Sequence, residues 1–423
     1  MNNAKNTTLF PYLERLLEGE AVEWKTLGEV AELYTGLSGK NKEHFKKGNA
    51  PYVTYKNIFE NLAVDSSILE MVSIEADERQ HSIKYGDILI TGSSENIEEV
   101  GMASVVTFHP ETGIYLNSFS FGIRFHPTVQ LSPEFTKYLF RSDLLRKQIM
   151  KTASGVTRFN VSKKKFSAIT IPIPPLRVQA RIVEILDKFT QLEAELEAEL
   201  EARRAQYEYY RNQLLSYDAL ASRGPVEWLK LGEVGEFVRG SGLQKSDFVD
   251  EGLPCIHYGQ IHTRFGIAAD EAVANISVMQ FHRLKHANHG DLLIATTSED
   301  DEAVGKATVW LGQEEVAIGG DMFIFRHVLE PKYVSYFFAS SLFGDQKRPY
   351  ITGTKVRRIS EKGLSRIRIP VPSIEEQRRI ADVLDRFDAL VNDISSGLPA
   401  EIAARRTQYE YYRDRLLSFL EKK

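Results

Sequence analysis

One long segment, present twice in the chain, constrains the fold more than any other feature. Residues 171–217 read IPIPPLRVQARIVEILDKFTQLEAELEAELEARRAQYEYYRNQLLSY, and residues 369–419 read IPVPSIEEQRRIADVLDRFDALVNDISSGLPAEIAARRTQYEYYRDRLLSF. Each copy opens with prolines, which favour an extended approach followed by the start of a helix. Apolar residues then recur at spacings of three and four, which is typical of one face of a long helix.

The apolar stripe predicts what these helices do. In the first copy it consists of Ile182, Ile185, Leu186, Phe189, Leu192, Leu196, Leu200, Tyr207, Tyr210 and Leu214. About 40 helical residues make a rod on the order of 60 Å long. A single rod leaves its stripe in water, whereas two similar rods can pack against each other. We therefore expect a two-helix spacer that holds two other parts of the chain apart. In the second copy, Gly397 and Pro399 should interrupt the helix, with Pro399 restarting it.

Further segments are duplicated in the same order. The segment VEW followed by LGEV occurs from residue 22 and from residue 226, and YGDILITGSSENIEEVGMASVV at residue 85 returns as HGDLLIATTSEDDEAVGKATVW at residue 289. The start of the chain, LFPYLERLLEGEAVEW, resembles the linker NQLLSYDALASRGPVEW after the first helix. One unit of domain plus helix therefore occurs twice. We expect a circular, pseudo-two-fold arrangement with neighbouring chain ends.

Each repeated domain mixes strand and helix signals. ILITG and LLIAT are short apolar runs typical of buried strands, and SFSFGIRF at 118–125 alternates like a half-buried strand. Residues 134–150 and 331–346 have helical spacing. The predicted fold class is α+β, with two mixed α/β globular domains joined by two long antiparallel helices. The predicted boundaries are an N-terminal segment 1–20, a first domain 21–170, a central helix 171–218, a second domain 219–368 and a C-terminal helix 369–423.

Composition limits the class of protein. With 423 residues, 43% of them hydrophobic, the chain can build two or more cores. The single cysteine, Cys255, and the lack of a signal peptide or an 18-residue apolar run predict a cytoplasmic protein without a membrane span. The net charge of −5 argues mildly against nucleic-acid binding. Any such binding must therefore come from local basic patches.

Catalytic and metal-binding patterns are missing or weak. The sequence has no G-x-x-x-x-G-K-[ST], no G-x-G-x-x-G after a strand, no NPPY- or DPPY-like tetrapeptide and no convincing catalytic triad. His282, His286 and His289 have a spacing that could place them on one helix face, as in a metal site. The matching positions of the first repeat are Glu78, Ser82 and Tyr85. We therefore interpret the three histidines as ordinary surface or core residues.

Three pairs of polar loops are candidates for contact with a ligand. The loops after the paired strands are either polar turns that satisfy the backbone or loops that read base edges, where carboxylates accept from cytosine N4. The lysine-bearing, Gly-rich loops at 36–57 and their counterparts suit phosphate contacts plus groove readout, and a merely solvated loop has equal weight. The third pair consists of the basic loops at 154–165 and 352–360, whose cations are candidates for contacts with phosphates or guanine. The candidate residues are Lys40, Asn41, Lys42, Lys46, Lys47, Tyr55, Lys56, Asn57, Ser93, Ser94, Glu95, Arg158 and Lys163 in the first repeat, and Arg239, Ser241, Lys245, His257, Tyr258, Gln260, Thr297, Ser298, Glu299, Lys355, Arg357 and Arg358 in the second.

Taken together, the landmarks resemble a known family. VEWKTLGEV, YGDILI, the two Ile-Pro-x-Pro helix starts and both RR-x-QYEYYR segments, in duplicate and in order, resemble the specificity subunits of type I restriction-modification systems. The LEAE repeat resembles the short repeats that some members carry in the central helix.

The resemblance implies a function and partners. It implies two target recognition domains, each binding one half of a split DNA sequence, and an antiparallel coiled-coil ruler between them. It also implies that two modification subunits and the restriction subunits dock on this chain. S-adenosylmethionine, ATP and Mg²⁺ then belong to those partners, and the chain itself is not an enzyme and carries no cofactor. The alternative is a stand-alone two-headed DNA-binding adaptor. An enzyme in its own right is disfavoured by the missing motifs.

Overall fold

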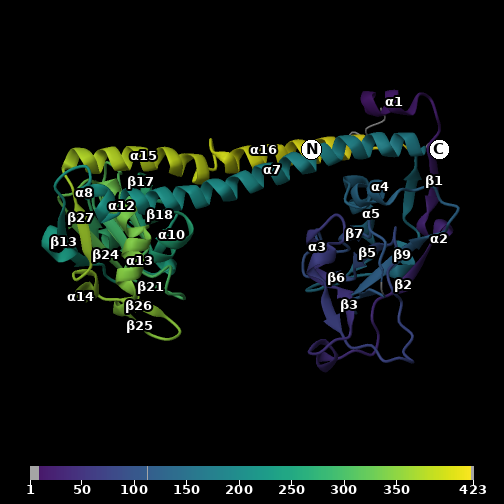
Figure 1. The fold of residues 1–423 in the computed structure, drawn as a ribbon, viewed down its shortest axis with the longest axis horizontal. Coiled ribbons are helices and arrows are strands. Elements are labelled where there is room, and N and C mark those ends of the chain that lie inside the picture. The colour runs from purple at the N-terminus through teal and green to yellow at the C-terminus, as the bar shows by residue number, and fades with distance from the viewer. Residues whose placement is uncertain (1–8, 112, 421–423) are drawn as a thin grey trace. The chain divides into compact units, whose positions relative to one another are not determined.

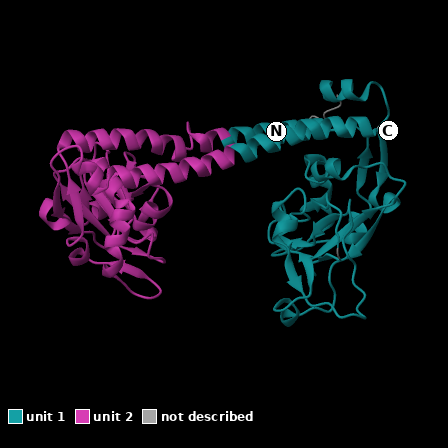
Figure 2. Cartoon of the chain, viewed as in Figure 1, with its two compact units in different colours: residues 1–195, 402–423 teal, residues 196–401 magenta. Residues whose placement is uncertain are grey.

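The chain forms two compact units in a computed structural model that describes residues 9–111 and 113–420 (Figure 1). Unit 1 comprises residues 1–195 and 402–423, and unit 2 comprises residues 196–401 (Figure 2). Part of the predicted N-terminal segment, residues 1–8, and the last three residues of the predicted C-terminal helix lie outside the described residues. No helix in the described part of the chain is long and apolar enough to cross a membrane.

An antiparallel sheet forms the centre of unit 1. Its order is β2-β9-β5-β7, and the strands are β2 (Ala31–Thr35), β9 (Ser120–Phe125), β5 (Ile88–Thr91) and β7 (Ala103–Val105). Strand β5 is buried throughout, which confirms the prediction for ILITG. Two of the smaller sheets of this unit are β4-β3-β8 (Glu70–Val72, Ala50–Val53, Tyr115–Leu116) and the pair β1-β12 (Glu23–Thr26, Thr170–Ile173).

The predicted strand at 118–125 begins two residues late, at Ser120. The reason is a local turn, because the Asn117 side chain accepts hydrogen bonds from the Phe119 N–H at 3.0 Å and the Ser120 hydroxyl at 3.0 Å. The predicted helix at 134–150 is in fact two helices, α4 (Pro133–Leu139) and α5 (Asp143–Thr152). The Ser142 hydroxyl donates to the Leu139 carbonyl at 2.6 Å, which favours a turn at the junction.

Both ends of the chain contribute to the core of unit 1. Helix α1 (Pro11–Leu17), the first part of α7 (Leu176–Leu214) and the last part of α16 (Leu398–Leu416) share one hydrophobic cluster. Leu13 and Ile182 are fully buried in it, and Leu416 is 2% exposed. This confirms the predicted neighbouring chain ends. It also shows that the first part of the apolar stripe packs on a domain core, and not only on the other helix.

The main sheet of unit 2 follows the same order with one strand more. It runs β14-β24-β20-β22-β17, formed by Gly235–Arg239, Met322–His327, Leu292–Ala295, Ala307–Trp310 and Ala268–Ala269. A second sheet, β15-β18-β16-β23-β19, consists of Phe248–Val249, Ala274–Ile276, Leu253–Ile256, Val316–Ile318 and Lys285–Ala287. The strands β13 (Glu227–Lys230) and β27 (Arg368–Val371) pair as β1 and β12 do in unit 1.

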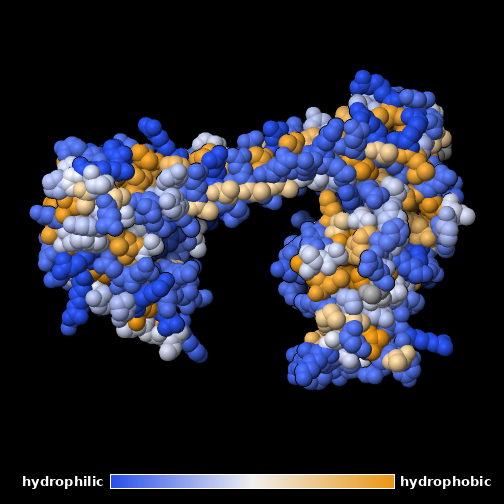
Figure 3. Space-filling view, in the orientation of Figure 1, coloured by the Kyte–Doolittle hydropathy of each residue, from blue (hydrophilic) through white to orange (hydrophobic). Residues whose placement is uncertain are grey.

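Short helices surround these sheets. Unit 1 has α2 (Leu27–Val30), α3 (Tyr55–Glu60) and α6 (Lys163–Phe166), and unit 2 has α8 (Tyr217–Ala221), α9 (Leu231–Val234), α10 (Tyr258–Thr263), α11 (Val278–Phe281), α12 (Pro331–Phe338), α13 (Ser341–Lys347) and α14 (Glu361–Leu364). Single turns of 3₁₀ helix lie at Lys42–Phe45, Ser66–Ile68, Lys245–Asp247 and Arg348–Tyr350. On the face drawn in Figure 3, hydrophilic side chains cover most of each unit, and smaller hydrophobic areas are scattered among these side chains.

The second helical copy is interrupted as predicted. It divides into α15 (Ile374–Asn392) and α16, which restarts at Leu398 beside Pro399. The Asp393 carboxylate accepts the Ser395 N–H at 2.7 Å in the intervening turn. A Cβ atom on Gly397 would lie 2.5 Å from the Ala389 carbonyl oxygen, so the turn needs glycine there.

Antiparallel helix contacts repeat in the two units. In unit 1, the rings of Phe189 and Tyr412 stack with their centroids 5.5 Å apart. In unit 2, Phe387 and Tyr210 stack with the same 5.5 Å separation. Each unit thus combines the beginning of one helical copy with the QYEYYR end of the other. These matched contacts show that the helical segments pack in the same way within each unit.

Candidate nucleic-acid interface

A small three-stranded sheet brings two of the predicted loops together in each unit. In unit 1, β6 (Ser93–Ser94) pairs with β11 (Phe159–Val161), which pairs with β10 (Ala153–Ser154). In unit 2, β21 (Thr297–Ser298), β26 (Arg357–Ile359) and β25 (Ile351–Thr352) repeat this arrangement. The loop after the buried strand and the basic loop, predicted as separate candidates, therefore form one surface.

The tip of this hairpin is shaped by a glycine in both units. Gly155 has φ +146°, and a Cβ atom there would lie 1.9 Å from the Arg158 carbonyl oxygen. Gly353 has φ +95°, and its Cβ would lie 2.1 Å from the Val356 carbonyl oxygen. Both positions tolerate only glycine without rearrangement. The turn projects its tip outward, and Val156 is 92% exposed.

Two adjoining cavities form a concave surface in unit 1. The first, of about 410 Å³, is lined by Tyr55, Phe59, Ser93, Ser94, Glu95, Glu99, Phe119 and Arg158. The second, of about 560 Å³, is lined by Lys40, Asn41, Lys42, Phe45, Tyr52, Thr54, Tyr55, Lys56, Glu70, Asn117, Ser118 and Phe119. They share Tyr55 and Phe119. The Tyr55 hydroxyl donates to the Ser93 carbonyl at 2.9 Å, and Arg158 Nε donates to Ser93 Oγ at 3.1 Å. These bonds join three segments that lie far apart in sequence.

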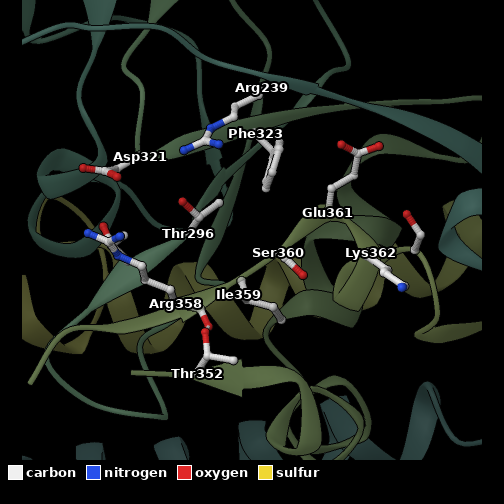
Figure 4. Close-up of a pocket in the computed structure, with 12 residues that line it drawn as sticks. Arg239, Thr296, Asp321, Phe323, Thr352, Arg358, Ile359, Ser360, Glu361 and Lys362 are labelled. Carbon is white, nitrogen blue, oxygen red and sulfur yellow. The ribbon is translucent and has the colours of Figure 1, made fainter. Parts of the chain in front are cut away.

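Unit 2 has a cavity of about 640 Å³ beside its three-stranded sheet (Figure 4). Of the predicted residues, Arg239, Thr297 and Arg358 line it. The side chains of Arg239, Asp321 and Arg358 gather at one side of the cavity. The rest of its polar lining consists of Thr296, Thr352, Ser360, Glu361, Lys362 and Ser365. The cavity thus offers cations, a carboxylate and hydroxyl groups, which suits contacts with phosphates and base edges.

Several predicted residues have partners within the protein. Asn57 is fully buried, and its amide donates to the Asp65 carbonyl at 2.8 Å. The Lys40 ammonium lies 2.5 Å from the Glu78 carboxylate. This hydrogen bond is the largest of the effects that lower the pKa of Glu78 to about 2. Arg357 lies 2.9 Å from Asp301. These side chains hold the recognition loops together.

Other predicted residues also have local contacts in the structure. His257 is the N-cap of α10, its N–H donates to the Gln260 side chain at 2.9 Å, and burial lowers its pKa. Two lysines lie near glutamates: Lys46 pairs with Glu43 at 2.7 Å, and Lys56 lies 3.9 Å from Glu60. Lys163 lies over the Phe121 ring, Tyr258 lies against His257, and the Ser298 hydroxyl accepts from the Asp300 N–H at 3.5 Å. Ser241 has a buried hydroxyl, whereas Lys47, Lys245, Glu299 and Lys355 are exposed.

The three histidines of unit 2 do not share a helix face. Helix α11 ends at Phe281, and His286 lies in β19. His286 Nε2 bonds to the Phe281 carbonyl at 2.7 Å, and His289 Nδ1 bonds to the Leu311 carbonyl at 3.0 Å. No cluster of three metal-ligating side chains occurs within residues 9–111 and 113–420. The spacing of these three histidines in the sequence therefore does not bring them together on one helix.

Sequence reasoning missed four cations that support these surfaces. Arg146 Nη2 donates to the Val100 carbonyl and Lys347 Nζ donates to the Val304 carbonyl, each at 2.7 Å. Arg141 Nη2 donates to the Phe59 carbonyl at 2.9 Å, and Lys306 Nζ donates to the His262 carbonyl at 3.2 Å. The two units use different sequence positions for the same task, so comparing the repeats could not have revealed them. Phe119 was also missed, because the strand predicted at 118–125 concealed a loop position. Asp321, at the matching position of unit 2, was missed as well.

Comparison with known proteins identifies the family. The family model described as type I restriction modification DNA specificity domain matches residues 20–202 and 225–404. The chain is 32% identical to the type I restriction enzyme EcoR124I/EcoR124II specificity subunit of Escherichia coli, over 96% of this chain and 97% of that protein. It is 28% identical to a putative type I restriction enzyme specificity subunit of Haemophilus influenzae, over 96% and 98% of the two chains.

A solved structure agrees in fold. It comes from work titled "Structural basis underlying complex assembly and conformational transition of the type I R-M system", with a TM-score of 0.68 and 21% identity, and the match covers 94% of this chain and 98% of the other. The two matched domains coincide with the two copies of the domain-plus-helix repeat. The chain belongs to the type I restriction-modification specificity subunits and recognises DNA sequence with two domains.

Proposed function

We propose that each unit reads one half of a bipartite DNA target, using the three-stranded sheet and the cavities beside it. The observation that carries this proposal is the repetition of that sheet, with its glycine-shaped hairpin tip, in both units. The segments 21–170 and 219–368 are then the two target recognition domains. The loops of the two domains differ in sequence, whereas the strands that carry them are arranged alike. This difference suits the recognition of two different half-sites.

The chemistry of the surface supports a division of labour. Exposed cations such as Arg158, Arg239 and Arg358 contact phosphates or guanine edges. Glu95 and Glu299 follow the short strands β6 and β21 and accept from exocyclic amino groups. The net charge of −5 confines phosphate contacts to these local basic loops.

Helix α7 then determines the gap between the half-sites. Its 39 residues continue from unit 1 into unit 2 without a break. Bases that lie between the two recognised halves go unread, because the helix gives the domains a set spacing.

In this proposal the chain recognises the target sequence, and its partner subunits carry out the reactions on the DNA. In this proposal two modification subunits carry S-adenosylmethionine, and restriction subunits use ATP and Mg²⁺. No cofactor binds to the specificity subunit itself. The exposed Tyr209 and Tyr411 of the QYEYYR segments, 60% and 52% exposed, are suited to contact such partners.

The length of α7 provides the test. Inserting one LEAE unit after Glu199 adds about 6 Å of helix, at 1.5 Å per residue. The recognised motif should keep both half-sites and gain one or two unread base pairs. A matched control replaces Leu196–Glu199 with a length-preserving AEAE sequence, which should leave the gap unchanged. Motifs are read by mapping methylated bases in cells that express each variant. An unchanged gap in the insertion variant would refute the ruler.

A further inference from the structure

Positions 119 and 321 occupy the same place in the two units but carry opposite chemistry. Phe119 directly precedes β9, and Asp321 directly precedes β24. The Phe119 carbonyl accepts the Gly92 N–H at 2.9 Å, and the Asp321 carbonyl accepts the Thr296 N–H at 2.9 Å. In both units the donor is the residue that follows the buried central strand. The backbone frame is therefore the same, and the side chain differs.

Phe119 presents an apolar ring in the recognition surface of unit 1. The residue is 67% exposed and lines both cavities of this unit. Its neighbour Tyr55 stacks instead on Phe59, with ring centroids 6.0 Å apart. The Phe119 N–H is bound to Asn117 Oδ1 at 3.0 Å, so the backbone is held on both sides while the ring stays in solvent. A positioned, uncovered apolar group suits contact with an apolar group on a ligand.

Asp321 presents a carboxylate at the matching place of unit 2. It lies on the same side of the cavity as Arg239 and Arg358 (Figure 4). Across the described part of the chain, the Asp321 carboxylate forms no hydrogen bond or ion pair with another residue. Its oxygens are thus available to accept from a ligand that enters the cavity between the two cations.

We propose that this position determines base specificity in both half-sites. Phe119 contacts the C5-methyl group of a thymine in the half-site read by unit 1. Asp321 accepts a hydrogen bond from the N4 amino group of a cytosine in the half-site read by unit 2. The major groove displays both groups, and they are the features that apolar and acidic side chains recognise there. The inference rests on the proposed function, in which each unit reads one half-site.

The test begins with the target of the unaltered protein. The full-length chain, purified from its host with the subunits that accompany it, selects duplexes from a randomised DNA library. Each thymine of the half-site read by unit 1 is then replaced by uracil, which lacks only the methyl group. One replacement should weaken binding about four-fold, the effect of about one buried methyl group. In Phe119→Ala the same replacement should have no effect. Ile68→Ala, which removes an exposed apolar side chain outside both cavities, should behave like the unaltered protein.

A parallel measurement addresses unit 2. Replacing the contacted C·G pair by T·A should weaken binding of the unaltered protein at least about five-fold. The Asp321→Ala variant should bind both duplexes equally within about two-fold. Thermal unfolding of each variant at an unchanged temperature shows that the fold is retained.

The outcomes separate this inference from the proposed function. Selection of no motif, or of one uninterrupted motif, would refute the proposed function. A bipartite motif would support it, and the inference would then be overturned by any of three results: a uracil effect that survives Phe119→Ala, a cytosine preference that survives Asp321→Ala, or half-sites without the required thymine and cytosine.

Discussion

Unit 2 should be more sensitive to acid than unit 1, because a histidine stands where unit 1 has phenylalanine. His327 ends β24 opposite Gly235, and Phe125 ends β9 opposite Ala31. The His327 ring lies 5.2 Å from the Phe325 ring, and burial lowers the pKa of His327 from 6.5 to about 4. The unfolded chain therefore binds a proton between pH 6.5 and 4 that the folded unit excludes. Stability must fall as the pH falls through this window.

The size of the effect follows from the two pKa values. A shift from 6.5 to about 4 removes about 2 kcal/mol from the free energy of unfolding between pH 7.5 and pH 5. His327→Phe should abolish this loss while changing the stability at pH 7.5 by less than about 1.5 kcal/mol, since phenylalanine fits the matching strand position.

The assay is denaturant unfolding at both pH values, followed by the fluorescence of Trp228 and Trp310 in unit 2. A Trp24→Phe background removes the tryptophan signal of unit 1. His282→Gln, at an exposed histidine of unit 2, serves as the control, and in it the loss of stability between pH 7.5 and pH 5 should persist. An equal loss of stability in His327→Phe and in the unaltered protein would refute the reasoning.

Two further substitutions test the support of the recognition surface. Gly155→Ala places a Cβ atom against the Arg158 carbonyl at a positive φ, so the affinity for DNA should fall at least about five-fold. Gly344→Ala is the control, because a Cβ atom there meets open space, and it should leave the affinity unchanged in the same binding assay. Lys347→Met leaves the Glu302 and Val304 carbonyls without their donor, which costs about 1–3 kcal/mol. We expect faster hydrogen exchange at residues 299–305 in this variant. Lys285→Met, which replaces an exposed lysine, is the control and should leave the exchange unchanged. Unchanged exchange in Lys347→Met would contradict the anchoring role.

The sequence contained enough to predict the architecture. The duplicated landmarks and the three- and four-residue spacing of apolar residues predicted two domains, the long helix and its interruption near Gly397. Periodicity reports which face of an element is buried, and the duplication reports which elements correspond. The helix predicted at 134–150 was wrong in its continuity, because the bond from the Ser142 hydroxyl to the Leu139 carbonyl is invisible in a hydrophobic pattern.

The candidate surface was less accessible to sequence reasoning. Ser93 and Asn160 pair across a sheet although 66 residues separate them, and no local pattern encodes that pairing. Asn57 carries the right chemistry for an adenine contact, but the fold directs it to the Asp65 backbone. The anchors Arg146 and Lys347 do the same work from positions that the repeat does not align. Loop chemistry can be read from sequence, whereas the exposure of a loop side chain depends on tertiary contacts.

Exchange of one domain tests the central claim most directly. Residues 225–368 are replaced by the corresponding segment of another family member, and the recognised motif is mapped before and after. The account predicts a new second half-site, an unchanged first half-site and an unchanged gap. A change in both half-sites would contradict two separate readers joined by a helix of set length.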